Sequence, residues 1–438
     1  MKHSRFSQAI SRSDTKKHMG RVDKVIGMTI ESTGPEAKIG DVCNIYPSYR
    51  AAGKGIQAEV VGFREEKVLL MPYEDLSGIG PGSIVESTGE VLKIPVGDQL
   101  IGRVLDGLGR PMDEIEGLKD MEHCPVHNIP SNPLKRPMID TKISVGVKAI
   151  DGLLTLGKGQ RMGIFSGSGV GKSTLLGMVA RNIEADINVI GLVGERGREV
   201  REFIERDLKE EGMAKSILVV ATSDQSSMSR LKCAMVATTI AEYYKDRGKD
   251  VLLMMDSLTR FAMAQREVGL AIGEPPVARG YTPSIYTLMP KLLERSGNFE
   301  NGSITGIYTV LVEGDDVNEP ISDTVRGIID GHIVLSRAIA MRNHYPAIDV
   351  LASISRLMTE VVSPEHMKLA GELRKILSIY NQNFDLISIG AYKHGTNAEI
   401  DDAIRKIERV NGFLTQGIND RFDYDTALSL MKEVFAAH

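Results

Sequence analysis

The sequence contains little cysteine and no long apolar run, and both absences narrow the possible classes of protein. Its three cysteines, Cys43, Cys124 and Cys233, are scattered and odd in number, and they lack the spacing of metal ligands. This usage gives no disulfide framework and is typical of a reducing cytosol. No apolar stretch approaches the ~18 residues that a membrane-spanning helix needs, and residues 1–19 lack a signal-peptide core. We therefore expect a cytosolic protein that can still dock on a membrane machine.

A strong net charge is also absent. The 438 residues carry a formal net charge of −5, with 42% hydrophobic and 25% charged residues. This balance gives no reason to expect a nucleic-acid surface across the whole protein. The length exceeds that of one ordinary domain, so we expect about two or three domains.

The pattern of residues changes along the chain and predicts an α/β protein with separate segments. Residues 1–19 are polar and basic and form a candidate partner-binding segment, with a frayed terminus as the alternative. Residues 20–92 contain short strands broken by glycine and proline, which predicts a small β-barrel. In residues 93–360 apolar strands alternate with helices, which predicts a RecA-like nucleotide-binding domain with a mostly parallel sheet. Residues 361–438 predict a C-terminal helical domain.

Local patterns predict individual elements within these segments. Ser363 before Pro364 is typical of a helix N-terminus, and Thr396 with Glu399 has the spacing of a capping box. We expect the helix after Thr396 to end at the Asn-Gly pair 411–412. The expected strands are 22–32, 56–63, 67–72, 161–166, 187–194, 216–223 and 251–256, and the expected helices include 199–211 and 229–247.

The sharpest local signal is SGSGVGKST at residues 166–174, between an apolar strand and a helical segment. Its glycines allow a tight turn that aims backbone N–H groups at phosphate oxygens. Lys172 supplies a positive charge for the β- and γ-phosphates, and the Ser173 hydroxyl can ligate Mg²⁺. The strict motif has glycine where this chain has Ser166, so a solvated glycine-rich turn is the alternative. The expected ATP-binding residues of the loop are Gly167, Ser168, Gly169, Val170, Gly171, Lys172, Ser173 and Thr174.

Two carboxylates that follow apolar strands are candidates for the same site. Asp256 ends the run VLLMMD, as a Mg²⁺-orienting carboxylate does beside a phosphate loop. By itself such an aspartate is more often a cap or turn residue. Glu195 follows INVIGLVG and should lie at the carboxyl edge of the sheet, where it can orient the water that attacks the γ-phosphate. The alternative is that Glu195 only begins a solvated, charged helix.

Taken together, these residues resemble the family of rotary-type hexameric ATPases, which includes the catalytic subunits of F-type and V-type ATP synthases and the related export ATPases. The resemblance extends from about residue 20 to the C-terminus. PAIDVLASIS at 346–355, followed by Arg356, is similar to the signature segment of this family. Further similar segments are 96–113, 146–165, 278–297 and 334–349.

The resemblance implies a role for each matching residue. Lys172 and Ser173 match the phosphate-loop lysine and the hydroxyl that ligates Mg²⁺, so ATP is the implied substrate and Mg²⁺ the implied cofactor. Glu195 matches the carboxylate that positions the attacking water. Asp256 matches the Walker B aspartate, the second candidate Mg²⁺ ligand.

The resemblance also implies a site that is shared between subunits. Arg356 matches the arginine finger, which reaches into the neighbouring subunit's nucleotide and is worth about 10³–10⁵ in kcat. Tyr345 matches an aromatic residue that packs on the adenine ring, and an ordinary core tyrosine is the alternative. Because one chain holds both Glu195 and Arg356, identical copies could complete each other's sites. We therefore expect a homohexamer.

Within this family, residues 163–178 and 194–205 are most similar to the flagellar export ATPases, and virulence type III secretion ATPases are the alternative. This branch implies an ATPase at the cytoplasmic face of an inner-membrane export apparatus, where it releases chaperones and unfolds cargo at the export gate. It also implies a central-stalk-like partner and a stator-like regulatory partner at the N-terminus. Phe6 and Ile10 could form the apolar face of a short helix for that last contact.

Two other classes of function remain open from the sequence. An RNA translocase of the termination-factor type would need a basic surface with aromatic residues in the barrel. The barrel has balanced charge and few aromatics, so we expect no nucleic-acid partner. A non-catalytic nucleotide-binding subunit is the third hypothesis, and Glu195 argues against it. The aromatic residues of 20–90 are Tyr46, Tyr49, Phe63 and Tyr73.

Overall fold

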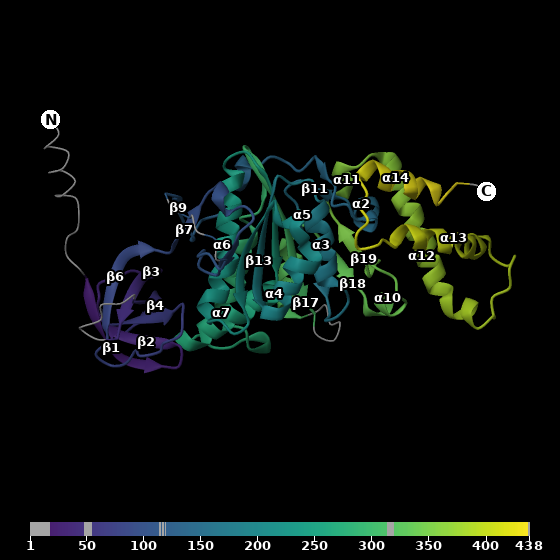
Figure 1. Ribbon diagram of the computed structural model, residues 1–438. Coiled ribbons are helices and arrows are strands. Elements are labelled where there is room, and N and C mark those ends of the chain that lie inside the picture. Colours follow the sequence, from purple (N-terminus) through teal and green to yellow (C-terminus); the bar gives the residue numbers. More distant parts are fainter. Residues whose placement is uncertain are drawn as a thin grey trace, which may run out of the picture.

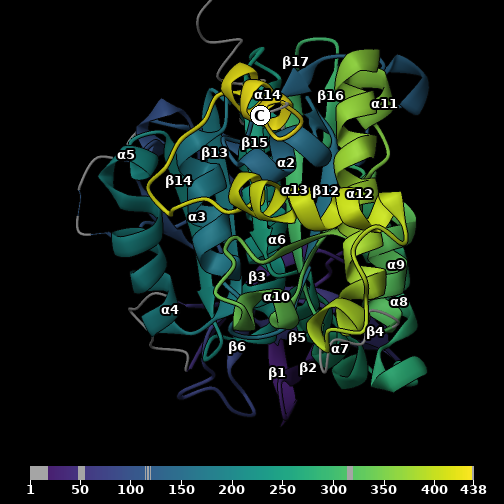
Figure 2. The same ribbon diagram turned by 90° about the vertical axis from the view of Figure 1, so that its right-hand side faces the viewer.

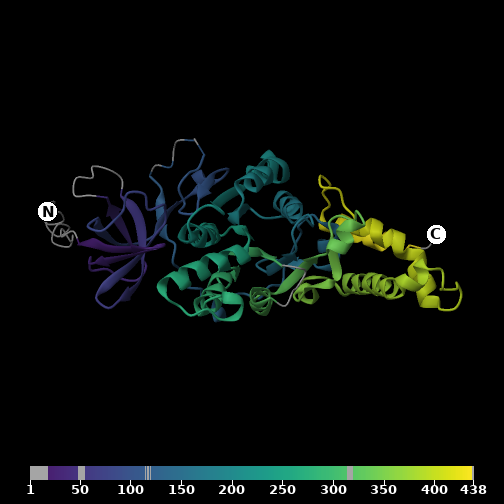
Figure 3. The same cartoon turned by 90° about the horizontal axis from the view of Figure 1, so that it is seen from below.

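The computed structural model describes residues 18–47, 55–113, 115, 118, 120–312 and 319–436. A barrel, a central sheet covered by helices and a C-terminal helical part follow one another along the molecule (Figures 1 and 3). This confirms the predicted fold class. The candidate partner-binding segment 1–19 lies almost wholly outside the described residues and stays a prediction.

The N-terminal part is a closed barrel of antiparallel strands in the order β1-β2-β5-β4-β3-β6, with β6 pairing back onto β1. The predicted strand 22–32 is wrong as a single strand, because Gly27 has a φ of +57° and turns the chain between β1 and β2. Alternate side chains such as Ile30, Val60 and Leu70 are buried in its core. The strands are β1 (Met19–Ile26), β2 (Thr29–Thr33), β3 (Asp41–Tyr46), β4 (Ile56–Arg64), β5 (Lys67–Pro72) and β6 (Ile84–Val91).

The central sheet has the strand order β19-β18-β12-β17-β15-β13-β14-β8, with β16 pairing to β17 off this path. The pairs along the path are parallel except β18 with β19, which confirms the prediction of a mostly parallel sheet. The strands are β8 (Val104–Asp106), β12 (Arg161–Ser166), β13 (Ile187–Glu195), β14 (Ser216–Thr222), β15 (Asp250–Asp256), β16 (Gly297–Phe299), β17 (Gly302–Leu311), β18 (Gly331–Leu335) and β19 (Ile348–Ser355).

Helices cover both faces of this sheet, which explains why its strands are apolar without alternation. In β15, Val251, Leu253 and Met255 join the apolar cluster that includes α6 (Ser227–Lys245), α7 (Leu258–Ile272) and α8 (Pro283–Leu293). Leu252 and Met254 join the cluster on the other face, which includes α3 (Lys172–Asn182). A strand buried on both faces needs apolar residues at every position.

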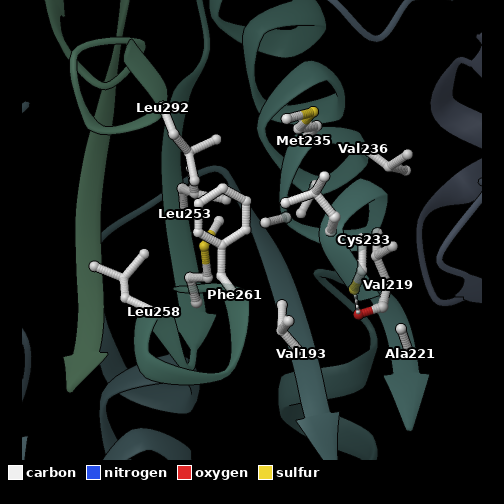
Figure 4. Close-up of a cluster of buried hydrophobic side chains, with 14 of the residues drawn as sticks. Val193, Val219, Ala221, Cys233, Met235, Val236, Leu253, Leu258, Phe261 and Leu292 are labelled. Carbon is white, nitrogen blue, oxygen red and sulfur yellow. Dashed lines mark hydrogen bonds between the residues drawn. The ribbon is translucent and has the colours of Figure 1, made fainter. Parts of the chain in front are cut away.

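Figure 4 shows part of the first cluster, where side chains of α6 and α7 pack on the sheet. Cys233 of α6 is fully buried there, and its Sγ donates a hydrogen bond to the Val219 carbonyl at 3.3 Å. All three cysteines are free, as their scatter in the sequence predicts. Within the described ranges, no helix is both long and apolar enough to cross a membrane.

The predicted helix 199–211 is interrupted. It consists of α4 (Gly197–Glu202), a π-helical turn η3 (Phe203–Leu208) and α5 (Lys209–Met213). The remaining elements of this region are β7 (Lys93–Val96), η1 (Asp98–Leu100), β9 (Glu122–Pro125), η2 (Pro133–Lys135), β10 (Lys142–Ile143), α2 (Lys148–Leu153), β11 (Leu156–Gly157), η4 (Ala278–Gly280), α9 (Pro320–Ile328), α10 (Arg337–Met341) and α11 (Met358–Val361).

The C-terminal part consists of α12 (Pro364–Ser388), α13 (Ala398–Leu414) and α14 (Tyr424–Glu433), which lie in front of the sheet in Figure 2. Ser363 caps α12 by accepting from the His366 N–H, as predicted. The capping box at Thr396 is wrong. Asn397 is the N-cap of α13, because its side-chain oxygen accepts the exposed N–H groups of the first turn. The helix also continues past the Asn-Gly pair at 411–412.

Candidate nucleotide site

The loop of residues 166–174 lies between β12 and α3, at the carboxyl edge of the parallel sheet. Gly169 and Gly171 have φ angles of +78° and +90°, a region that favours glycine. Gly171 is the N-cap of α3 and offers no side-chain hydrogen bond, so the first N–H groups of the helix stay available for an anion. The local backbone therefore fits a phosphate.

A cavity of about 550 Å³ opens in front of this loop, a volume typical of small-molecule sites. The Val170 side chain is buried in the core beneath the loop, so it leaves only its backbone for a ligand. The other predicted loop residues and Glu195 line the cavity. The lining residues are Ser166, Gly167, Ser168, Gly169, Gly171, Lys172, Ser173, Thr174, Glu195, Arg196, Glu199, Arg206, Thr259, Arg260, Met263, Leu311, Val312, Glu319 and Arg337.

Lys172 lies between two carboxylates. Its Nζ contacts the Asp256 carboxylate closely and lies 3.7 Å from Glu195 Oε1. Asp256 also accepts a hydrogen bond from Thr309 at 2.7 Å. Burial alone would lower the pKa of Lys172, but the charges of Asp256 and Glu195 outweigh it and raise that pKa. The structure thus brings together three of the residues that the sequence assigned to the site.

Glu195 is the end residue of β13 and is largely buried. Burial raises the pKa of its carboxyl, the nearby charge of Asp256 raises it further, and Lys172 opposes both effects. Among the described residues, Glu195 Oε1 has no hydrogen-bond partner. A carboxylate with a raised pKa and an oxygen that makes no hydrogen bond within the protein can accept a hydrogen bond from water or take a proton from it.

Tyr345 and Arg356 lie outside the cavity lining. Tyr345 borders the loop, because a Cβ added to Gly171 would lie 3.5 Å from its ring. Its side chain is 40% exposed, which argues against an ordinary core tyrosine. Arg356 is exposed just after β19, and its guanidinium donates to the Arg326 carbonyl at 3.4 Å. Within a single chain, Arg356 is therefore not part of this cavity.

The structure adds Arg260, to which the sequence analysis gave no role. Arg260 lies near the start of α7, and its Cβ would be 3.0 Å from a Cβ added to Gly194. Its Nε is buried and has no hydrogen-bond partner among the described residues. A buried, unpaired guanidinium nitrogen that lines a phosphate cavity is a candidate anion ligand. Its position four residues after Asp256 is a signal that the sequence did offer.

Family models match three stretches of the chain. The nucleotide-binding domain of the ATP synthase alpha/beta family matches residues 146–355, and the β-barrel domain of that family matches residues 22–89. The T3SS EscN ATPase C-terminal domain matches residues 362–433. The three matches follow the three structural parts in order.

Individual relatives match nearly the full length. The chain is 56% identical over 420 residues to the flagellum-specific ATP synthase of Bacillus subtilis (strain 168), covering 96% of each chain. It is 49% identical over 419 residues to the type 3 secretion system ATPase of Xanthomonas euvesicatoria, covering 95% of this chain and 94% of the other.

Two solved structures share the fold. The assembled ATPase EscN of the enteropathogenic E. coli type III secretion system superposes with a TM-score of 0.90 at 46% identity, covering 95% of this chain and 100% of that one. EscN in complex with its central stalk EscO gives a TM-score of 0.88 at 45% identity, with the same coverage. This chain is therefore an ATP-hydrolysing enzyme that belongs to the ATP synthase alpha/beta family, in the group formed by flagellum-specific ATP synthases and type III secretion ATPases.

Proposed function

We propose that this chain is the Mg²⁺-ATP-hydrolysing motor of flagellar protein export and that it works as a homohexamer. The observation that carries the proposal is the separation of Glu195 from Arg356. The cavity holds the phosphate loop, Lys172 and Glu195, whereas Arg356 is exposed outside it. A site that needs an arginine finger is then completed by a second copy of the chain.

The loop, three side chains that line the cavity or its floor, and the neighbouring Tyr345 each have a part under this proposal. The loop N–H groups and Lys172 bind the β- and γ-phosphates, which displaces Lys172 from its contact with Asp256. Glu195 orients the attacking water through Oε1, which makes no hydrogen bond to the described residues. Arg260 stabilises the charge that develops on the transferred phosphoryl group. Tyr345 packs against the adenine ring beside Gly171.

The side chains beside the loop suit Mg²⁺, which substrate phosphates help to hold, better than they suit a metal that needs only protein ligands. The Ser173 hydroxyl and the Asp256 carboxylate are hard oxygen donors. In the described part of the chain, no group of three or more His, Cys, Asp or Glu side chains could hold a metal ion. Mg²⁺ typically binds through one or two such donors and the substrate phosphates. When bound, it neutralises charge on the phosphate oxygens.

The relatives and the exposed surfaces support a proposal for assembly and export. EscN occurs assembled and with its central stalk EscO, and we propose a corresponding stalk contact for this chain. Leu386 and Ile389, at the end of α12, are 49% and 75% exposed and are candidates for it. We place the protein at the cytoplasmic face of the inner membrane, beside a membrane export gate. Its further proposed partners are a stator-like protein at the N-terminus and chaperones with their cargo.

The flagellar branch is proposed because the Bacillus subtilis flagellum-specific relative is more similar, at 56% identity, than the Xanthomonas euvesicatoria secretion relative, at 49%. Complementation tests this assignment. The gene should restore motility to a strain that lacks its flagellar export ATPase. Restoration of virulence-type secretion alone would favour the other branch.

Mixing two inactive variants tests the shared site. Glu195→Gln and Arg356→Ala should each bind nucleotide and fail to hydrolyse it. In a random mixture of equal amounts, about one quarter of head-to-tail interfaces pair an intact Glu195 with an intact Arg356. Up to about one quarter of the wild-type ATPase rate should therefore return, with hexameric mass confirmed by light scattering.

The matched control mixes Glu195→Gln with Lys172→Ala. Both changes damage the nucleotide side of the same subunit, so no combination completes a site and the mixture should stay inactive. A mixture of Glu195→Gln and Arg356→Ala that also stays inactive, although the subunits co-assemble, would show that Arg356 does not act between subunits.

A further inference from the structure

The connection between β18 and β19, residues 336–347, contacts the phosphate loop at two places. Near its start, the Arg337 guanidinium donates from Nη2 to the Ser168 carbonyl at 3.5 Å. Near its end, the Tyr345 ring lies against Gly171. The two contacts lie at the two ends of the outer turn of the loop, residues 168–171, so one segment supports both ends.

This connection is itself held in place from two directions. The Ser336 N–H donates to the Ala347 carbonyl at 2.8 Å, which closes the connection at its base. The Gln416 N–H donates to the Tyr345 carbonyl at 2.9 Å from the C-terminal part. The exposed Arg342 guanidinium lies 5.0 Å from the centre of the Phe384 ring on α12, but the two backbone hydrogen bonds hold the connection without its side chain. Arg337 therefore lies on a segment that hydrogen bonds hold in place.

The outer turn of the loop has few other contacts. Ser168 and Gly169 are exposed, and a Cβ added to Gly169 would meet no atom within 4 Å. Because a peptide unit is planar, the direction of the Ser168 carbonyl also fixes the direction of the Gly169 N–H. A donor on the Ser168 carbonyl thus orients an N–H group of the phosphate cradle.

Arg337 is suited to this task because its charge is not used elsewhere. It lines the nucleotide cavity, and it makes no ion pair with any residue that the structure describes. The contact is a single exposed hydrogen bond, so its effect should be modest. A typical net hydrogen bond changes a binding constant by about three- to tenfold.

We propose that Arg337 is a positioning residue of the ATPase site, which holds the outer turn of the phosphate loop in its phosphate-binding conformation through the Ser168 carbonyl. It acts on the part of the nucleotide that the loop cradles. The affinities for ADP and ATP should therefore depend equally on Arg337, whereas the rate of the chemical step should not depend on it. This inference rests on the proposed role of the loop as the nucleotide site.

The test compares Arg337→Ala with the wild-type hexamer. The affinities for a fluorescent ADP and for a fluorescent, non-hydrolysable ATP analogue, both with Mg²⁺, should weaken by the same factor of about three to ten. KM for ATP should rise by the same factor and kcat should change by less than about twofold. Arg337→Lys, which keeps a donor and a charge, should recover most of the loss.

Arg342→Ala is the matched control, because it removes the same charge from the same connection at a site away from the loop, and it should leave both affinities unchanged. Equal affinities of Arg337→Ala and wild type for ADP would overturn the inference. So would a loss confined to the ATP analogue, which would indicate a direct γ-phosphate contact, or an equal loss in Arg342→Ala. A wild-type chain that binds neither nucleotide would instead overturn the proposed site itself.

Discussion

Replacement of Lys232 by methionine is expected to weaken the attachment of the barrel to the central sheet. Lys232, on α6, is 1% exposed, and its Nζ lies 2.7 Å from Oε2 of Glu59 on β4. His127 Nε2 lies 2.8 Å from the same Nζ, and the Tyr73 hydroxyl donates to Glu59 at 2.5 Å. The substitution leaves the Glu59 carboxylate buried without its cation.

The size of the effect follows from the lowered pKa of Glu59 and from the usual cost of leaving a buried charge unpaired. Burial alone would raise the pKa of Glu59, but the charge of Lys232 and the hydrogen bonds from His127, Lys232 and Tyr73 lower it from 4.5 to about 2. One pKa unit is worth about 1.4 kcal/mol, so this lowering corresponds to about 3 kcal/mol. Removal of one partner of a buried ion pair typically costs about 3–5 kcal/mol. We therefore expect a loss of about 3 kcal/mol.

Thermal unfolding at neutral pH measures this loss. If the chain melts as one unit, an unfolding entropy of roughly 2.1 cal/mol/K per residue makes 3 kcal/mol a fall of about 3 °C in Tm. Lys67→Met is the control, because its 2.8 Å pair with Asp23 lies on the barrel surface. Surface pairs are worth about 0–1 kcal/mol, so its Tm should change by about 1 °C or less.

The double variant Lys232→Met/Glu59→Gln separates the ion pair from simple packing. Without the buried charge it should melt above Lys232→Met, since the removal of both partners costs less than the removal of one. A Lys232→Met Tm equal to that of wild type would refute the reasoning. A double variant that melts no higher than the single variant would refute it as well.

Three further predictions concern acid stability and the nucleotide site. Because the folded-state pKa of Glu59 is lowered, its contribution is fully present above pH 4.5 and is lost as the pH falls toward 2, so Tm between these values should fall more steeply in wild type than in Glu59→Gln. Arg260→Ala should lower kcat by about 100-fold and leave ADP affinity nearly unchanged, and a normal kcat would exclude a role in the transition state. Asp256→Asn should raise the Mg²⁺ concentration needed for half-maximal activity by about 10- to 100-fold, and an unchanged Mg²⁺ titration would remove Asp256 from the metal site.

The sequence predicted the fold class because the relevant signals are local. Apolar runs of strand length predicted β12, β13, β14 and β15. A strand buried on both faces is apolar throughout, so the polar residues that flank it indicate where it begins and ends. The run 22–32 misled because Gly27 turns the chain without a strong turn signature around it. Thr396 misled because Asn397, one residue later, is an equally good cap.

Site residues were predictable where a motif coincides with the end of a strand or the start of a helix. They were missed where only the packing of distant segments brings a side chain to the site. Glu195 and Asp256 end strands, so the topology brings them to one edge together with the loop. Arg260 and Arg337 sit near the starts of helices and look like ordinary surface cations in the sequence. Only the position of Arg260, four residues after Asp256, is a local signal. The approach of both side chains to the loop depends on how α7 and the β18–β19 connection pack.

The edge strand β8 has a consequence for how this protein can be divided. The chain completes its sheet with Val104–Asp106, which precedes the remaining strands of the sheet by more than 50 residues and pairs in parallel with β14. A fragment that began at residue 146, where the match to the nucleotide-binding family model starts, would leave this edge of the sheet open. Open, apolar edges recruit other chains, so such a fragment should self-associate through β14. The natural cutting point for a soluble catalytic fragment is therefore before residue 104, within the stretch that joins the barrel to the sheet.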